Sequence, residues 1–273
     1  MRTTGAGFAV RPYRLLFRAG IRQQSTYRLA MLGGLVANLT FGFLKVAMLF
    51  ATVEAAGGEV AGYTVATMST YIWLSQGMLG SVNLYGRTDL ALRIKSGDVA
   101  VDFLRPLDVH LAHIATDVGK GVWALLPRGL PSVLIGALVV GMALPSSPWA
   151  YALGALSLLL GITVSAATVY LVGTAGFWLV EGRGVQTFYM VVSGFLAGLF
   201  VPISLFPRWL EIVATCTPFP SMMMYPIDVL SGRIDGLAAV GLVAAQVGWL
   251  ALMLIIGQAL TRAGRRTVEV QGG

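Results

Sequence analysis

Charged side chains are scarce in this chain of 273 residues. They make up 11% of it, whereas hydrophobic residues make up 56%. Soluble globular domains carry about 25% charged residues, so this composition excludes a soluble protein and indicates one embedded in a membrane. Cysteine is nearly absent as well. The single Cys216 excludes an intramolecular disulfide, so packing must hold any loops outside the membrane.

The sequence also lacks the motifs on which several enzyme classes depend. No phosphate-binding loop of the form G-x-x-x-x-G-K-[ST] occurs, because the GKG string at 119–121 has the wrong spacing. No hydrophobic run carries acidic residues paired for catalysis. His110 and His113 could approach a metal together with nearby aspartates, but a solvated helix at the membrane edge explains them more simply. We therefore expect no catalytic residue, no metal site and no cofactor bound by this chain.

Basic residues outnumber acidic ones, which gives a net charge of +7 at pH 7. A basic protein can bind nucleic acid, but here no soluble domain is left to carry such a site. The positive charges lie instead at the ends of hydrophobic runs, where they face anionic lipid headgroups. Membrane lipids are therefore an expected partner, and nucleic acid is not.

Six apolar runs are long enough to cross a bilayer core of about 30 Å, which takes roughly 20 residues. Because the bilayer offers no partners for free N–H and C=O groups, such runs must be helices. The sequence therefore predicts an all-α integral membrane protein, with residues 1–273 forming a single transmembrane domain. The runs cover residues 29–52, 62–85, 119–144, 149–180, 185–205 and 237–260.

Lys and Arg residues gather on one side of the predicted membrane, and short cytoplasmic segments carry such an excess. The opposite side holds only Arg208 and Arg233. We therefore expect a multi-pass protein with both termini in the cytoplasm. The basic residues on the cytoplasmic side are Arg2, Arg11, Arg14, Arg18, Arg22, Arg28, Arg87, Arg93, Lys95, Arg105, Arg183, Arg262, Arg265 and Arg266.

Residues 8–28, ahead of the first run, predict an amphipathic helix at the membrane interface. Four arginines share one face at helical spacing. Such a helix lies in the plane of the membrane surface with its apolar side down. It could be a simple topology anchor, or part of a platform that receives a peripheral subunit. The arginines are Arg11, Arg14, Arg18 and Arg22, and the opposite face contains Tyr13, Leu16, Phe17 and Gly20.

A charged interruption over residues 86–108 separates the second and third runs. Within it, residues 96–98 predict a turn, and Asp98 is placed to cap a short helix over 99–104 that Pro106 then ends. Apolar residues alternate with charges of both signs along this helix. Such a knob suits docking into a groove on another protein, and the alternative is a loop helix packed on its own bundle.

The string IKSGDVAVDFLRPLD after the second run, behind a basic interfacial helix, resembles the permease subunits of type-2 ABC transporters. Within that group it is most similar to the bacterial branch that includes viologen exporters. The string VPISLFPRWLEIVATCTPFPSMMMYPIDVL at 201–230 matches the proline-marked connection between the last two spans of such permeases. The resemblance implies six spans, a cytoplasmic coupling helix in loop 86–111, and an extracytoplasmic re-entrant element over 206–234, between spans five and six.

The resemblance also implies a division of labour. This chain would form the substrate path of an exporter in the bacterial cytoplasmic membrane, and a separate ATPase subunit would bind ATP and magnesium. Closure of the ATPase would tilt two permease halves between inward and outward opening. The second half would be an identical or related permease in a dimer. The residues that would contact the ATPase are Ile94, Gly97, Asp98, Asp102, Arg105 and Pro106.

Gly194 and Gly198 lie at the GxxxG spacing that allows two helices in lipid to approach closely, either within one chain or between two. Two basic residues lie inside predicted spans. Lys45 is late enough in the first run for its ammonium to reach the outer interface. Arg128 lies deeper in the third run, where it could face an aqueous cavity, pair with an anionic headgroup or find a partner inside the bundle.

Polar and aromatic side chains within the runs are the candidates for lining the path, because polar atoms that face lipid are costly. Aromatic rings attract cations, so the expected cargo is an amphipathic or drug-like compound, as in multidrug efflux. The candidates are Tyr71, Trp73, Gln76, Asn83, Arg128, Phe188, Met190 and Ser193.

Two other kinds of protein fit much of the same sequence. A secondary carrier usually shows inverted repeats and acidic residues inside the membrane, and neither is evident here. A membrane scaffold would use loop 86–111 to dock a partner without moving a substrate. Dependence of efflux on ATP and on that loop separates both from an ATP-driven permease.

Overall fold

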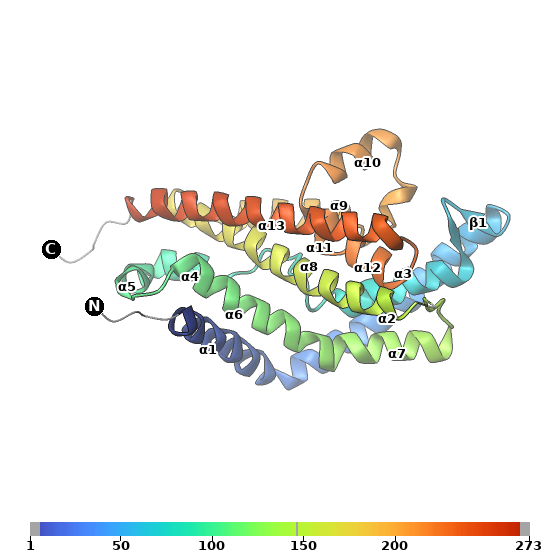
Figure 1. The fold of residues 1–273 in the computed structure, drawn as a ribbon, viewed down its shortest axis with the longest axis horizontal. Helices are drawn as coiled ribbons and strands as arrows, with labels where there is room; N and C mark the ends of the chain where they lie inside the picture. The colour runs from blue at the N-terminus through green and yellow to red at the C-terminus, as the bar shows by residue number, and fades with distance from the viewer. Residues whose placement is uncertain (1–5, 146, 268–273) are drawn as a thin grey trace.

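Four long apolar helices run along one axis of the computed structural model, which describes residues 6–145 and 147–267 (Figure 1). Each is long and apolar enough to cross a membrane. They correspond to the first, third, fourth and sixth predicted runs, so the chain is a mainly helical, multi-pass membrane protein. Arg2, one of the basic residues ahead of the first run, lies outside the described residues. The long helices are α2 (Arg28–Ala55), α6 (Val109–Ala124) continuing into α7 (Leu130–Val139), α8 (Pro148–Thr174) and α13 (Gly236–Arg265).

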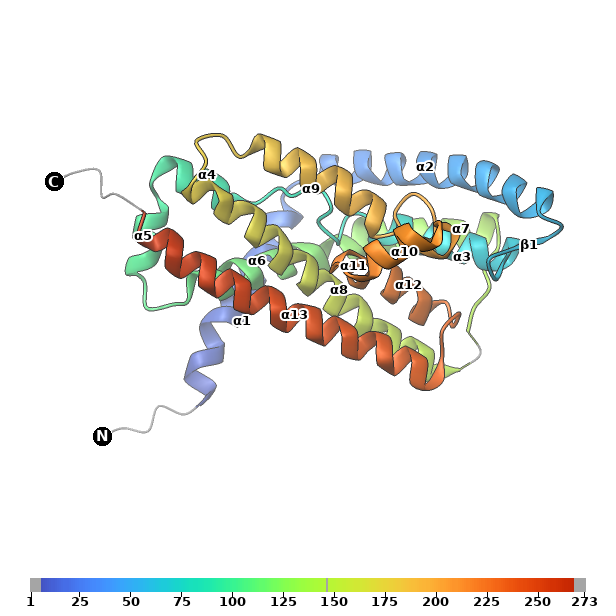
Figure 2. The ribbon, with the colours of Figure 1, turned by 90° about the horizontal axis from the view of Figure 1, so that it is seen from above.

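The second and fifth predicted runs form shorter helices than expected. The helices α3 (Val65–Met78) and α9 (Arg183–Leu196) contain 14 residues each, which is about 21 Å at 1.5 Å per residue. A bilayer core is about 30 Å thick. Six full-length spans are therefore not confirmed. Figure 2 shows α9 lying along the same axis as the long helices.

The two ends of the molecule carry different elements (Figure 1, Figure 2). At one end lie α4 (Asp89–Ser96), α5 (Val99–Leu104), the start of α1 (Ala6–Ser25) and the end of α13. At the opposite end, the loop after α2 forms an antiparallel hairpin of β1 (Glu59–Val60) and β2 (Tyr63–Thr64), which the all-α prediction did not include. Both described ends of the chain therefore lie at the α4–α5 end.

The helix α8 is the centre of the bundle and contacts α6, α12 (Met224–Leu230) and α13. Glycines on α8 allow this close packing, because a Cβ atom on Gly161 would lie 2.5 Å from the main-chain oxygen of Met222. A buried side chain on α13 adds polar contacts. The Gln246 amide nitrogen donates hydrogen bonds to the main-chain oxygens of Ser157 and Ser221, so this amide is paired without water.

Short helices occupy the region between α9 and α13 that was expected to be re-entrant. They are a 3-10 turn (Ile203–Leu205), α10 (Arg208–Thr215), α11 (Phe219–Met222) and α12. Figure 1 shows α10 projecting from the bundle. Asp228 on α12 pairs with Arg233 at 2.7 Å, and the Arg233 guanidinium lies 5.0 Å from the ring centroid of Tyr63. These contacts tie α12 to the β1–β2 hairpin.

The turn that follows α9 is held by side chains from two other helices. The buried Lys45 on α2 donates a hydrogen bond to the main-chain oxygen of Leu199, and the Tyr71 hydroxyl on α3 donates one to Gly198 at 2.6 Å. The expectation that Lys45 reaches the outer interface is therefore wrong, because an acceptor inside the bundle satisfies its ammonium. Gly194 and Gly198 were expected to form a GxxxG contact on one helix, and this expectation is wrong. The helix α9 ends at Leu196, and Gly198 has a φ of 75°, so Gly198 lies outside the helix.

His110 is buried rather than solvated, which corrects the sequence prediction. The helix α6 begins at Val109, well ahead of the predicted third run, so the histidine is enclosed by α6, α8 and α13. Its ring lies 4.3 Å from that of Tyr170. A Cβ atom on Gly257 would lie 2.4 Å from the histidine Cε1 atom, so this glycine makes room for the imidazole.

The N-terminal helix α1 packs on α6, and its predicted position at the membrane interface remains a prediction. In Figure 2 it crosses the long axis obliquely. Two glycines form the crossing: a Cβ atom on Gly20 would lie 2.0 Å from the main-chain oxygen of Thr116, and one on Gly119 would lie 2.1 Å from that of Phe17. The arginine face points away from this contact, because Arg11, Arg14, Arg18 and Arg22 are exposed.

Replacement of Gly119 by Val is expected to detach α1 from α6, because backbone on the facing helix leaves no space for a side chain. Overpacking of this kind costs about 1–3 kcal/mol. We expect a lower thermal midpoint of the detergent-solubilised protein and faster tryptic cleavage after Arg18 and Arg22. The control is Gly33→Val on α2, where a Cβ atom would meet nothing within 4 Å. Equal midpoints and equal cleavage rates in the two variants would contradict the close crossing.

Candidate functional site

The second predicted run unwinds inside the bundle. After α3 ends at Met78, residues 79–88 follow an irregular path toward α4. Gly86 has a φ of 65°, which a residue with a side chain adopts only with strain. Irregular backbone at membrane depth is tolerated only where it is buried in protein or lines a cavity. Residues 79–88, which we call the unwound segment, meet both conditions.

Side chains from α8 and α9 provide the hydrogen bonds that a helix would have provided. Ser165 on α8 accepts from the main-chain nitrogen of Asn83 at 2.7 Å. On α9, the Tyr189 hydroxyl donates to the main-chain oxygen of Asn83 at 3.0 Å, and the Ser193 hydroxyl donates to that of Leu84 at 2.9 Å. The unwound segment is therefore attached to both helices.

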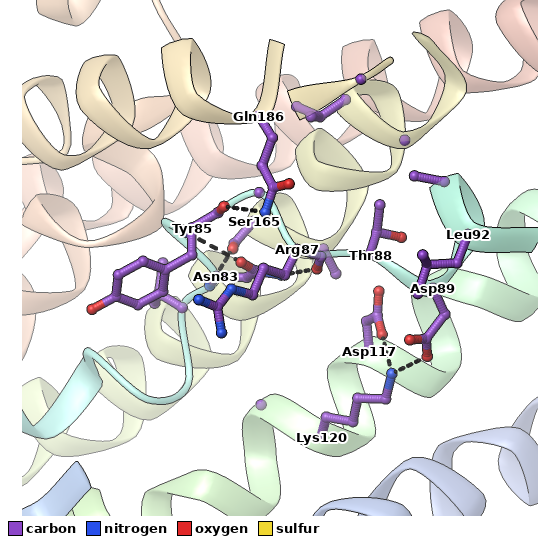
Figure 3. A pocket seen from close by; sticks show the side chains of 18 of the residues that line it. Asn83, Tyr85, Arg87, Thr88, Asp89, Leu92, Asp117, Lys120, Ser165 and Gln186 are labelled. Carbon is purple, nitrogen blue, oxygen red and sulfur yellow. Dashed lines mark hydrogen bonds and ion pairs between the residues drawn. The ribbon is translucent and has the colours of Figure 1, made fainter. Parts of the chain in front are cut away.

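A cavity of about 940 Å³ lies beside the unwound segment (Figure 3). Its wall comes from the unwound segment, the end of α1, α4, α6, α8 and the start of α9. The wall is mixed, since apolar residues such as Ile162 and Leu179 alternate with polar and charged ones. Ligand pockets are typically about 300–1,000 Å³ in volume, so the cavity could hold a drug-sized molecule.

Two groups of ion pairs join α4 to opposite sides of the cavity mouth. On one side, Lys120 on α6 lies 2.8 Å from Asp89 and 3.0 Å from Asp117 (Figure 3). On the other, Lys95 at the end of α4 lies 2.7 Å from Glu181 in the α8–α9 loop. Displacement of α4 would therefore strain its ion pairs with α6 and with the α8–α9 loop.

These pairs shift the acidity of two carboxyl groups outside the spans. Burial alone would raise the pKa of Asp89, but the hydrogen bond and charge of Lys120 outweigh it, so the pKa of Asp89 lies below its usual value. The hydrogen bond and charge of Lys95 also hold the pKa of Glu181 below its usual value. Both groups therefore stay ionised at neutral pH.

Arg128 lies on the cavity wall in a π-helical turn, Leu125–Gly129, between α6 and α7. Its Nη2 atom donates to the side-chain oxygen of Asn38 on α2 at 3.0 Å. Glycines make room for the guanidinium, because a Cβ atom on Gly34 would lie 2.5 Å from its Cζ atom and one on Gly80 would lie 3.3 Å from its Cδ atom. Arg128 therefore has a partner inside the bundle and also faces the cavity.

The elements α4 and α5 form a helical hairpin at the end of the molecule, which we call the terminal hairpin (89–104). Gly97 at its turn has a φ of 82° and ends α4. Asp98 was predicted to cap α5, but its side chain makes no capping hydrogen bond. Its carboxylate instead accepts a hydrogen bond from the Ser96 hydroxyl at 2.8 Å. The two helices are joined by Asp102, which accepts hydrogen bonds from Arg93 at 2.5 and 2.9 Å.

The terminal hairpin has one buried and one exposed apolar side. Leu90 and Val99 are buried against Tyr170 of α8. In contrast, Leu104 is 84% exposed and Val101 is 54% exposed. A soluble loop rarely keeps such residues in water, so the exposed side is suited to contact with another protein.

The family model for ABC-2 family transporter protein matches residues 36–272. This chain belongs to that family. As an ABC-2 family protein it is the membrane subunit of a transporter and not an enzyme, and the family implies an ABC ATPase as partner in general. No curated protein sequence matches the chain. Within the described residues, no group of three or more potential metal ligands occurs.

The ABC-2 fold brings together only some of the residues expected to line the path. Asn83 and Arg128 lie on the cavity wall. Phe188 and Met190 point outward from α9 and are 70% and 41% exposed. The remaining four candidates are buried in helix contacts away from the wall. They are Tyr71, Trp73, Gln76 and Ser193.

The expected ATPase contacts all lie on or next to the terminal hairpin of this ABC-2 protein. Gly97, Asp98, Arg105 and Pro106 are exposed. Ile94 packs against the buried side, beside Leu90, Val99 and Tyr170. Asp102 is buried and joins α4 to α5, so its direct role is to hold the hairpin together.

Several residues of the cavity wall and of the contacts beside it were not among the sequence candidates. Ser165 and Tyr189 hold the unwound segment, and Asp89, Lys120 and Glu181 form the ion pairs at the mouth. One signal was present, because Gly80 and Gly86 interrupt the second apolar run around a polar Asn83. The ion pairs carried no signal, since Asp89 and Lys120 belong to segments that meet only in the folded bundle.

Replacement of Ser165 by Ala is expected to loosen the unwound segment, because the Asn83 N–H loses its acceptor. A buried donor without a partner costs about 1–3 kcal/mol. We expect a lower thermal midpoint of the solubilised protein and faster amide exchange in residues 79–88. Thr163→Ala on the same helix is the control, since the Thr163 hydroxyl bonds only to the main-chain oxygen of Leu159. If both variants behaved alike, Ser165 would not hold the segment.

Replacement of Asp102 by Ala is expected to open the terminal hairpin, because Arg93 loses both of its hydrogen bonds to the carboxylate. Hydrogen bonds to charged groups contribute about 1.5–3 kcal/mol, so amide exchange of residues 99–104 should become roughly tenfold to a hundredfold faster. The control is Asp98→Ala, which removes the same charge from an exposed position. Unchanged exchange in the Asp102 variant would show that apolar packing alone holds the hairpin.

Proposed function

We propose that this chain is the permease subunit of an ATP-driven exporter in the bacterial cytoplasmic membrane. It would form one half of the substrate path and take its energy from a separate subunit that binds ATP and magnesium. The observation that carries the proposal is the terminal hairpin, with its exposed apolar side, in a chain of the ABC-2 family. The end of the molecule that carries this hairpin would face the cytoplasm, together with both termini.

Motion would pass from the ATPase to the cavity through α4. The exposed side of the terminal hairpin, with Leu104 and Val101, would dock into a cleft of the ATPase. The ion pairs of Asp89 with Lys120 and of Lys95 with Glu181 lie on the same helix. A push on the hairpin would therefore be transmitted to both walls of the cavity mouth, as alternating access requires.

The cavity beside the unwound segment would be the cytoplasmic entrance of the path. Its volume and its mixture of apolar and polar wall residues suit an amphipathic compound. Broken helices that line a cavity near the middle of the bilayer are a common construction for substrate sites in transporters. The rest of the path would come from a second permease chain, identical or related, because one bundle cannot enclose a path alone.

Two other functions remain as alternatives to be tested. A secondary carrier would move its substrate without an ATPase, and a scaffold would bind a partner without moving any substrate. Neither alternative explains why α4 joins an exposed docking surface to the walls of a cavity. Efflux that requires both ATP and the terminal hairpin separates the permease from both alternatives.

Replacement of Leu104 by Glu is expected to abolish co-purification of the ATPase subunit, because a charge would replace the most exposed apolar side chain of the hairpin. The full chain is tagged, purified from native membranes in mild detergent, and its partners are identified by mass spectrometry. We expect at least about tenfold less ATPase than with the unaltered chain. Gly97→Arg, at the hairpin turn, should have the same effect.

The matched control is Leu237→Glu, because Leu237 is 90% exposed at the opposite end of the molecule. This variant should retain the ATPase. Equal recovery with Leu104→Glu would exclude the terminal hairpin as the docking surface. Absence of any ATPase from the unaltered chain, even after cross-linking, would favour the carrier or the scaffold.

A further inference from the structure

The charges on the cavity wall do not balance. Five basic residues line it, namely Arg87, Lys95, Lys120, Arg128 and Arg183, against three acidic residues, Asp89, Asp117 and Glu181. All three carboxylates are already occupied. Lys120 lies between Asp89 and Asp117, while Glu181 pairs with Lys95 at 2.7 Å and with Arg183 at 3.3 Å. Within the described residues, Arg87 and Arg128 are left without a carboxylate partner.

Arg128 has the greater need of a counter-charge, because it lies within the candidate membrane span formed by α6 and α7. Its hydrogen bonds go to neutral oxygens only, those of Asn38 and, at 3.5 Å, of Gly34. Its Nε atom is buried and, among the described residues, has no hydrogen-bond acceptor. The residue as a whole is half-buried, and a partly desolvated cation without a counter-charge is costly. An anion entering the cavity would supply the missing charge and an acceptor.

Arg87 is placed at the cavity by the unwound segment. Its main-chain oxygen accepts a hydrogen bond from the Asn83 side chain at 2.7 Å, while its own guanidinium makes no hydrogen bond or ion pair within the described residues. Figure 3 shows this guanidinium on the Asn83 side of the cavity, away from Asp89, Asp117 and Lys120. It is therefore free to bind a ligand without breaking the pairs at the mouth.

The rest of the wall favours a ligand with an apolar part. Ile162, Ala166, Val172 and Leu179 line the cavity together with the charged residues. A cation is disfavoured there, because no carboxylate is free and the wall carries an excess of positive charge. The buried rings of Tyr71 and Trp73, which the sequence suggested as a cation site, do not line this cavity.

We propose that the cavity binds an amphiphile with an anionic headgroup, either a phosphate or a carboxylate, and that Arg87 and Arg128 are the headgroup-binding residues. The binding itself does not depend on the proposed function. Only the further step, that this ligand is the transported compound, rests on it. Two sources share the chemistry: a membrane lipid headgroup, or a single-chain amphiphile that enters from the cytoplasm. Arginine suits this role because its planar guanidinium can donate two hydrogen bonds to one such headgroup.

The test is direct binding to the full chain with its co-purifying subunits, in nanodiscs of phosphatidylcholine. The probes are radiolabelled dodecyl phosphate and dodecyltrimethylammonium, which have the same tail and opposite charge, and binding to empty nanodiscs is subtracted. We expect saturable binding of dodecyl phosphate only. Arg87→Gln and Arg128→Gln should each weaken it at least about tenfold, as loss of a charge-assisted contact predicts.

The control is Arg262→Gln, because Arg262 is exposed on α13 and lies outside the cavity wall. It should bind the probe as the unaltered chain does. If Arg128→Gln impairs folding, Arg87→Gln remains decisive, since no contact within the described part of the protein depends on that guanidinium. Saturable binding of the cationic probe alone, no saturable binding of dodecyl phosphate, or unchanged binding in the Arg87 variant would overturn the inference.

A second arm identifies the source of the headgroup. Part of the phosphatidylcholine is replaced by phosphatidylglycerol, and dodecyl phosphate binding is measured again. Competition would support the site with a lipid headgroup as occupant, and its absence would support the site with a single-chain amphiphile. Co-purification of the ATPase is recorded for every variant. If the unaltered chain retains its ATPase but shows no saturable binding of dodecyl phosphate, the anionic ligand is overturned and the proposed function stays intact.

Discussion

The need to pair backbone polar groups inside a membrane protein shapes the centre of this structure. Residues 79–88 leave the helix after Met78, and lipid would offer no hydrogen-bond partner to the main-chain groups that are freed there. Their N–H and C=O groups bind Ser165 on α8 and Tyr189 and Ser193 on α9. This requirement fixes α8 and α9 around the unwound segment. The same segment forms part of the cavity wall.

The ion pairs at the cavity mouth connect this centre to the end of the molecule. Lys120 on α6 pairs with Asp89 of α4, and Lys95 of α4 pairs with Glu181 in the α8–α9 loop. Asp102 joins α4 to α5. Exposed ion pairs contribute little to stability, so their importance lies in geometry. They connect α4, which belongs to the terminal hairpin, to α6 and to the α8–α9 loop, and both of these contribute to the cavity wall.

Elsewhere in the bundle, glycines and buried polar residues hold the helices together. Without a hydrophobic driving force between helices in lipid, close packing and hydrogen bonds hold them together. Gly119 lets α1 approach α6, and Gly161 lets α11 approach α8. Lys45 and Tyr71 hold the turn that follows α9, a helix shorter than a full span. The end of the molecule opposite the terminal hairpin is therefore held by short helices and polar contacts as well as by the long helices.

The sequence by itself determined the class of protein, four of the six predicted long helices, and the turn and short helix over 96–104 after the second apolar run. These depend on local properties: apolar length, Gly97 at a turn and Pro106 beyond a helix. Only the tertiary structure decided which polar residues share the cavity. Asp89 meets Lys120, and Asn83 meets Ser165, across segments far apart in the chain. Tyr71 and Trp73 were expected at the path but are buried, because helical spacing does not say which neighbour covers a face. The cavity exists because one run that reads as a continuous helix unwinds, and partners on α8 and α9 make that possible.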